Sequence, residues 1–135
     1  MIPGQARSGR EGRSILIVED DLDLREALSE VLRDEGYTVS MAADGQEALD
    51  HLRRQSRPSL ILLDLTMPVM NGWQFRSEQR QDPDLSGIPV VVLSAGDRLA
   101  EQVAPLGITD YVRKPIELSR LLRLIEQYCH EEGSR

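Results

Sequence analysis

Leu60-Ile61-Leu62-Leu63-Asp64 is the stretch of sequence around which the rest of the chain is arranged. Four consecutive aliphatic residues predict a strand that is buried on both faces. Pro68, shortly afterwards, cannot continue a central strand, because proline has no N–H to donate to a neighbouring strand. Asp64 is therefore expected at the carboxyl end of a central strand, which is where open α/β sheets bind ligands. Taken alone, this carboxylate is equally well explained as a cap for the turn or helix that follows.

The length and composition indicate one ordinary globular domain. With 135 residues, the chain is long enough for one hydrophobic core and too short for two. The formal net charge is −7 and no basic stripe is present, which argues against direct nucleic-acid binding. The apolar runs are far shorter than a membrane span, so we expect no membrane association. The single cysteine, Cys129, lies on the apolar stripe of the last helix, and this usage fits a cytoplasmic protein.

Strand and helix patterns alternate along the whole chain. The expected strands are 14–18, 37–43, 60–64, 88–93 and 109–112. A helical pattern follows each of them, which predicts an α/β fold: a three-layer, doubly wound (βα)5 parallel sheet with helices on both faces. We expect a disordered N-terminal tail over 1–13, the domain over 14–130 and a C-terminal tail over 131–135.

Reactive or charged side chains occur where most of these strands end. They are Glu19, Asp20, Asp64, Ser94 and Lys114. Because parallel strands share one edge, these residues are expected together, although two carboxylates 4 Å apart repel by roughly 4 kcal/mol at an effective dielectric of 20. A cation relieves that repulsion, and oxygen ligands without histidine or cysteine favour Mg²⁺ (or Mn²⁺) over zinc. Carboxylates, a metal, a lysine and a hydroxyl together indicate phosphoryl transfer to an aspartate nucleophile.

Taken together, these features resemble the receiver domain of two-component response regulators, of the single-domain type. The motifs that carry the resemblance are Ile15-Leu16-Ile17-Val18-Glu19-Asp20-Asp21, Leu62-Leu63-Asp64-Leu65-Thr66-Met67-Pro68, Asn71-Gly72, Val92-Leu93-Ser94-Ala95 and Asp110-Tyr111-Val112-Arg113-Lys114-Pro115. The resemblance implies a flavodoxin-like sheet with the strand order 2-1-3-4-5. It also implies a phosphorelay signalling module rather than an enzyme acting on other substrates.

The resemblance assigns the acceptor and the metal ligands residue by residue. Asp64 matches the phosphoacceptor. Asp20 matches the direct Mg²⁺ ligand and Glu19 the acidic neighbour that holds the ion through water. The backbone carbonyl of Thr66 completes the expected set of protein ligands. The implied phosphoryl donor is a sensor histidine kinase or a histidine phosphotransfer protein, and the downstream protein partner is unknown.

The resemblance also assigns the residues that respond to phosphorylation. Ser94 matches the switch hydroxyl that turns toward the phosphoryl group, and Lys114 matches the lysine that pairs with a phosphoryl oxygen. The bond between Lys114 and Pro115 is expected to be cis. Tyr111 matches the aromatic switch residue that moves between exposed and buried positions. Simpler explanations are a helix cap for Ser94 and ordinary packing for Tyr111.

Two departures from the family pattern are visible. The segment between Ser94 and Lys114 is shorter than usual, and Pro105 falls where the fourth helix normally continues, so a short or irregular helix is expected. Gly96 has no side chain to orient a water molecule, so fast self-dephosphorylation is not expected.

An Asp-nucleophile phosphohydrolase of the haloacid-dehalogenase type is disfavoured, since Thr66 stands where that class has a second aspartate. The remaining alternative is a degenerate receiver that acts as a phosphorylation-independent scaffold.

Overall fold

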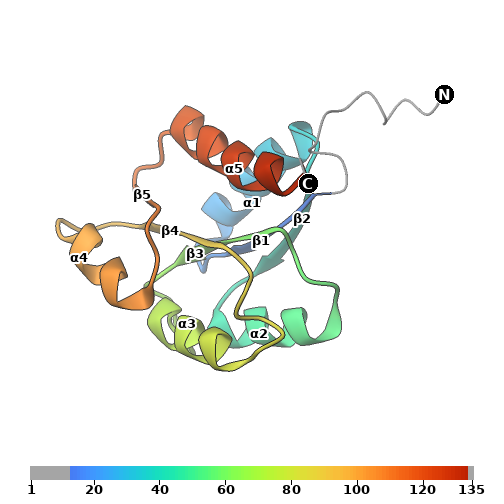
Figure 1. Cartoon of the computed structure of the whole chain (residues 1–135). Helices are drawn as coiled ribbons and strands as arrows, with labels where there is room; N and C mark the ends of the chain where they lie inside the picture. The colour runs from blue at the N-terminus through green and yellow to red at the C-terminus, as the bar shows by residue number, and fades with distance from the viewer. Residues whose placement is uncertain (1–12, 134–135) are drawn as a thin grey trace.

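The computed structural model describes residues 13–133 (Figure 1). Apart from Arg13, the N-terminal tail expected over 1–13 lies outside the described residues, as do positions 134–135 of the expected C-terminal tail. The elements in chain order are β1 (Ser14–Val18), α1 (Leu22–Asp34), β2 (Thr38–Ala42), α2 (Gly45–Arg54), β3 (Leu60–Asp64), α3 (Gly72–Gln81), β4 (Val90–Ser94), α4 (Leu99–Val103), the 3-10 turn η2 (Ala104–Leu106), β5 (Tyr111–Arg113) and α5 (Leu118–Gly133). Helix α5 thus runs three residues past the domain boundary expected at residue 130.

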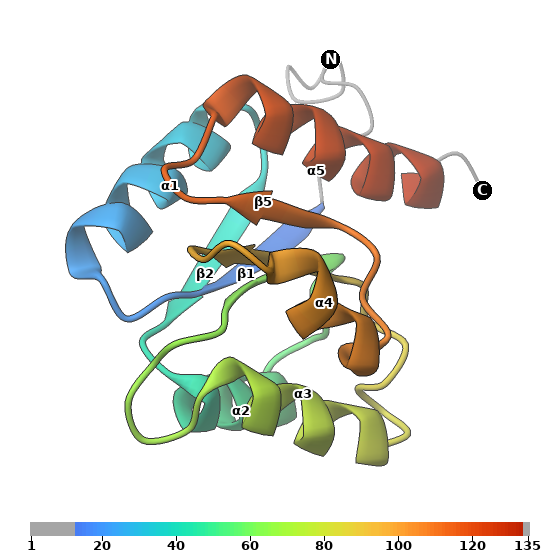
Figure 2. The ribbon, with the colours of Figure 1, turned by 90° about the vertical axis from the view of Figure 1, so that its left-hand side faces the viewer.

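The strands of the described residues form one parallel sheet. Its order is β2-β1-β3-β4-β5, and every neighbouring pair runs in the same direction. Figures 1 and 2 show α1 and α5 on one face of the sheet, and α2, α3 and α4 on the other. The predicted three-layer α/β fold and its flavodoxin-like strand order are therefore confirmed.

The central strands are buried on both faces, as the sequence pattern predicts. Leu16 and Val18 of β1 pack into the cluster that includes side chains of α2, α3 and α4. Ile15 and Ile17 point the other way, into the cluster with α1 and α5. All four side chains are fully buried, and each contributes roughly 1.5–3 kcal/mol of hydrophobic free energy. This packing fixes the carboxyl ends of the strands firmly in space.

The bounds of the last two strands differ slightly from expectation. Strand β4 begins at Val90 rather than at Ile88, since Pro89 between them has no N–H to donate to the sheet. Strand β5 begins at Tyr111 and ends at Arg113, because it pairs with Val92–Ser94 at the carboxyl end of β4. Both shifts bring the strands closer to the edge that carries the reactive side chains.

Side-chain caps start three of the helices. Asp21 caps α1 by accepting a 3.2 Å hydrogen bond from the N–H of Leu24, and Asp44 caps α2. Asn71 and Gln74 form a reciprocal capping box at the start of α3, with two hydrogen bonds of 2.9 Å. From the sequence, Asn71 is interpreted as part of a turn, so the structure adds the capping role.

The fourth helix is short, as Pro105 indicates. Helix α4 covers only Leu99–Val103, and the tighter turn η2 follows it directly. Pro105 lies inside η2, where its missing N–H cannot extend an α-helix. None of the helices in the described part of the chain has the length and apolarity needed to cross a membrane.

Candidate functional site

Four strand ends meet at one edge of the sheet. Val18 of β1 lies beside Leu63 of β3, so Glu19 and Asp64 leave these two neighbouring strands at the same level. Asp64 in turn lies beside Leu93 of β4. Ser94 lies beside Arg113 of β5, the residue before Lys114. The parallel register therefore gathers the residues that the sequence places at strand ends.

Three carboxylates form a cluster at this edge. Glu19, Asp20 and Asp64 each offer an oxygen atom, and these atoms all lie within 4.8 Å of one another. Glu19 and Asp64 are 1% and 4% exposed, whereas Asp20 is open to solvent. Two buried charges beside an exposed one give a site that can hold an ion and still be reached from outside.

Lys114 is the cationic partner of this cluster. Its Nζ donates a 2.8 Å hydrogen bond to Oε1 of Glu19 and lies 3.6 Å from Oδ1 of Asp64. Burial lowers the pKa of Lys114, but the hydrogen bond to Glu19 and the charges of Asp64 and Glu19 outweigh it, so the pKa is raised overall. Lys114 is also the only lysine in the sequence, since all other basic chains are arginine or histidine. A permanently protonated amine at this place can attract a phosphoryl oxygen.

The environment of Asp64 favours its neutral form more than water does. Burial raises the pKa of Asp64 to about 6, and the charge of Glu19 contributes to the rise. Lys114 and a 3.5 Å hydrogen bond from the N–H of Thr66 act in the opposite direction. At neutral pH the Asp64 carboxylate is therefore mainly ionised. A bound cation would readily lower its pKa and favour the ionised form further.

The backbone around Glu19 is held from several sides. Its N–H donates to the carbonyl of Ala42 at 3.0 Å, and its Oε2 accepts from the N–H of Asp21 at 3.0 Å. Its carbonyl accepts a 2.7 Å hydrogen bond from the guanidinium of Arg25 on α1. No pattern in the sequence indicates this role for Arg25, because the role depends on how the first turn of α1 lies against the strand end. Arg25 positions the acidic loop without joining the carboxylate cluster.

The remaining candidate residues lie around the cluster at different depths. Ser94 is buried at the end of β4, and its carbonyl accepts a 2.9 Å hydrogen bond from the N–H of Lys114. Thr66 is exposed just after β3. The peptide bond between Lys114 and Pro115 is cis. Tyr111 is half-buried and lies beside Val92, below the edge, where it packs against the core on the α2–α4 side.

The donor set fits a hard divalent cation. Three carboxylates face a single ammonium group, so the cluster keeps an excess of negative charge. All three donors are oxygen atoms, the ligand type of Mg²⁺ and Mn²⁺. His51, by contrast, lines a hollow beside the amino ends of β1 and β2, at the opposite edge of the sheet. The chemistry of the site therefore favours magnesium over zinc.

Comparison with known proteins gives a consistent result. The family model described as "Response regulator receiver domain" matches residues 15–126. An uncharacterized 14.6 kDa protein of Leptolyngbya boryana is 38% identical over 117 residues, which cover 85% of this chain and 88% of that protein. Response regulator MprA of Mycobacterium sp. (strain KMS) is 42% identical over 125 residues, which cover 88% of this chain and 53% of MprA. The chain thus spans about half the length of MprA.

Solved structures with the same fold include other response regulators. A putative response regulator from Chloroflexus aurantiacus J-10-fl superposes with a TM-score of 0.80 at 32% identity, covering 87% of this chain and 98% of that one. Response regulator TrrA from Thermotoga maritima, solved in complex with Mg²⁺ and BeF, has a TM-score of 0.76 at 27% identity, covering 86% and 98%. With the family model matching most of the chain and the acidic cluster in place, the chain belongs to the response regulator receiver domain family of two-component signalling.

Proposed function

We propose that Asp64 accepts a phosphoryl group from the phosphohistidine of a sensor histidine kinase or of a histidine phosphotransfer protein in the cytoplasm. The observation that supports this most directly is the buried Asp64 carboxylate, 3.6 Å from the Lys114 ammonium group and within 4.8 Å of two further carboxylates. In the transfer, an Asp64 oxygen bonds to phosphorus while the phosphorus–nitrogen bond breaks. Its electron pair returns to the imidazole of the donor.

Different residues of the chain would bind the metal ion and stabilise the charge of the phosphoryl group in this transfer. Glu19, Asp20, the Asp64 carboxylate and the backbone carbonyl of Thr66 would hold Mg²⁺ or Mn²⁺. When bound, the ion supplies positive charge that offsets the charge on the phosphoryl oxygens. Lys114 supplies a second positive charge through its Nζ. Burial of Glu19 and Asp64 limits water at the acceptor and strengthens these electrostatic interactions.

Phosphorylation would then change a partner-binding surface. A phosphoryl group adds about −1.5 to −2 charges and strong hydrogen-bond acceptors. The Ser94 hydroxyl would turn toward it and donate a hydrogen bond. Tyr111, half-buried next to β4, would follow into the vacated space. The surface formed by α4, β5 and α5 would change its preference among partner proteins.

Two observations favour this function over the alternatives. Asp64, the acidic pair and Lys114 are all present and lie close together, which does not favour a degenerate receiver used only as a scaffold. Thr66 has no carboxylate to act as a second acid or base, which disfavours a haloacid-dehalogenase-like phosphohydrolase. We therefore describe the protein as a signalling module whose chemistry is limited to its own phosphorylation and dephosphorylation.

Phosphorylation by a small phosphodonor tests the proposal. The wild type, Asp64→Asn and a matched control, Asp34→Asn at the exposed end of α1, would be incubated with acetyl phosphate with and without Mg²⁺. Intact-mass spectrometry should show one added phosphoryl group on the wild type and on Asp34→Asn, only with Mg²⁺, and none on Asp64→Asn. Equal modification of Asp64→Asn, or no modification of the wild type, would overturn the proposal.

A further inference from the structure

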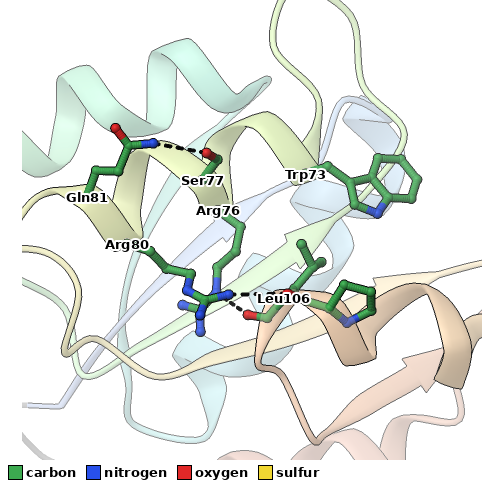
Figure 3. A pocket seen from close by; sticks show the side chains of 7 residues that line it. Trp73, Arg76, Ser77, Arg80, Gln81 and Leu106 are labelled. Carbon is green, nitrogen blue, oxygen red and sulfur yellow. Dashed lines mark hydrogen bonds between the residues drawn. The ribbon is translucent and has the colours of Figure 1, made fainter.

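A pocket lies on the face of the molecule between α3 and η2 (Figure 3). Its volume is about 290 Å³. Trp73, Arg76 and Arg80 of α3 line it on one side, and Pro105 and Leu106 of η2 line it on the other. Helix α4 is short, and η2, which follows it directly, lies against α3 at this pocket. The η2 side of the pocket thus belongs to the segment between Ser94 and Lys114, which is shorter than usual in the family.

Two arginines dominate the charge of this pocket. Arg76 and Arg80 are one helical turn apart and lie on the same face of α3. Among the described residues that line the pocket, none is acidic, although the chain as a whole has a net charge of −7. Burial lowers the pKa of Arg76, and the charge of Arg80 lowers it further. Two like charges beside each other, one of them half-buried, favour an anion between or above them.

Backbone carbonyls orient both guanidinium groups without neutralising them. Nε of Arg76 donates to the carbonyl of Leu106 at 3.0 Å, and Nη1 of Arg80 donates to the carbonyl of Pro105 at 3.3 Å. A second hydrogen bond of 2.8 Å joins Nη1 of Arg76 to Oε1 of Gln79. Each guanidinium has five N–H donors, so donors remain for a carboxylate from another molecule. Neutral carbonyl partners also leave the positive charge of both groups in place.

An apolar wall stands next to the cationic pair. Trp73 is 37% exposed and lies at one end of the pocket in Figure 3, near Leu106. An exposed indole beside arginines is typical of the residues that dominate protein–protein interfaces. The volume is at the lower limit of pockets that enclose small ligands, which are about 300–1,000 Å³. These features fit one or two side chains of a docked protein segment better than an enclosed metabolite.

We propose that the α3–η2 pocket binds an acidic segment of a partner protein, with a carboxylate on Arg76 and Arg80 and an apolar side chain against Trp73. Charge complementarity and the adjoining apolar wall select this occupant. The site differs from the acidic phosphoacceptor edge in charge and in the elements that build it. The proposal therefore does not depend on phosphorylation at Asp64.

Trp73 provides a direct measurement, since it is the only tryptophan in the sequence. The whole chain, labelled with ¹⁵N, would be titrated with the acetylated and amidated peptide Asp-Leu-Glu-Asp-Leu-Glu. The probe for comparison is the same peptide with Asn and Gln in place of its acidic residues. We expect the Trp73 indole resonance and those of η2 to shift saturably with the acidic peptide alone. The shift should weaken as salt is added.

Matched variants locate the binding groups. Arg80→Gln removes an exposed guanidinium that donates a 3.3 Å hydrogen bond to the carbonyl of Pro105, so the variant is expected to fold. It should weaken binding about tenfold or more, as expected for a lost charge-assisted hydrogen bond. Arg123→Gln, on the exposed surface of α5, makes the same charge change and should bind like the wild type. Correct folding of both variants is read from the dispersion of the same spectra.

Three results would overturn the proposal. The first is the absence of a saturable shift at millimolar acidic peptide. The second is equal binding of the neutral peptide or of Arg80→Gln. The third is saturation of the Trp73 resonance by inorganic phosphate or ATP at lower concentrations than by the peptide. That last outcome would assign the pocket to a small anion instead.

Discussion

The Nζ of Lys114 lies 2.8 Å from Oε1 of Glu19, across ninety-five positions of sequence, and is nearer to Glu19 than to Asp64, the proposed acceptor. Without a phosphoryl group, the lysine therefore serves mainly to balance the acidic edge. Its raised pKa follows from the hydrogen bond and charges that it meets there, which exceed the effect of burial.

This relationship predicts an unusual amine titration. Because Lys114 is the only lysine, reductive methylation with ¹³C-formaldehyde labels one ε-amine, together with the α-amine. The ε-amine of Lys114 should have a pKa above that of an ordinary lysine. Glu19→Gln should lower this pKa, because it removes a charge and a charged hydrogen-bond acceptor that oppose the effect of burial. The α-amine provides an internal reference signal, since model peptides place the pKa of such amines at roughly 7.7–8, well below that of a lysine amine. An unchanged midpoint in Glu19→Gln would contradict the contact.

The environment of Asp64 predicts that the stability of the folded chain falls as pH rises. The pKa of Asp64 rises from 3.8 to about 6 on folding, so the folded state binds the proton more strongly. In metal-free buffer, its contribution is fully present below pH 4 and is lost as pH rises through about 6. The loss amounts to about 2–3 kcal/mol at 1.36 kcal/mol per pKa unit. Urea unfolding of the wild type and of Asp64→Asn, compared between pH 4 and 7, measures the difference. A pH-independent difference would refute this prediction.

Close backbone packing at Gly72 predicts sensitivity to a single methyl group. A Cβ at Gly72 would lie 2.6 Å from the carbonyl oxygen of Asp64 and 2.7 Å from Cα of Leu65, both rigid backbone atoms. Gly72→Ala should therefore reduce the free energy of unfolding by about 1–3 kcal/mol or more. Gly87→Ala is the control, because its Cβ would meet only the flexible end of Arg57 at 3.3 Å. Equal stability of the two variants in thermal or urea unfolding would show that the contact is readily relieved.

The lifetime of the phosphorylated form depends on whether a side chain can orient a water molecule near Asp64. Gly96, two positions after Ser94, has no side chain and a positive φ of 125°. We expect the phosphorylated chain to persist well beyond seconds once the phosphodonor is removed. Intact mass, sampled over time without a phosphatase, measures the decay. Decay within seconds would show that another group activates the water.

The strand ends could be predicted from sequence because they depend on local patterns. An apolar run that ends in a carboxylate predicts that Asp64 lies at the end of a strand. A parallel sheet then brings Glu19 and Lys114 to the same edge. The hydrogen bond from Arg25 to the Glu19 carbonyl could not be predicted, since it requires the packing of α1. The capping box of Asn71 was missed because the same residues also favour a turn.

The α3–η2 pocket was beyond prediction for a related reason. Pro105 predicts the shortened helix correctly, but not where the chain after it settles. In the structure, carbonyls of η2 accept hydrogen bonds from Arg76 and Arg80, which lie thirty and twenty-five residues earlier in the chain. Long-range contacts of this kind leave no periodic trace in the sequence.

The brevity of α4 has a consequence for divergence within the family. The reacting groups are carried by strand ends, whereas α4 and η2 contribute none of the carboxylates or the lysine. Residues can therefore be gained, lost or exchanged there without disturbing the proposed phosphoacceptor site. In a cell that contains several receivers, changes in such a segment can prevent binding to the wrong partner proteins while the shared chemistry stays the same. Separate signalling pathways can therefore be kept apart by substitutions in this segment.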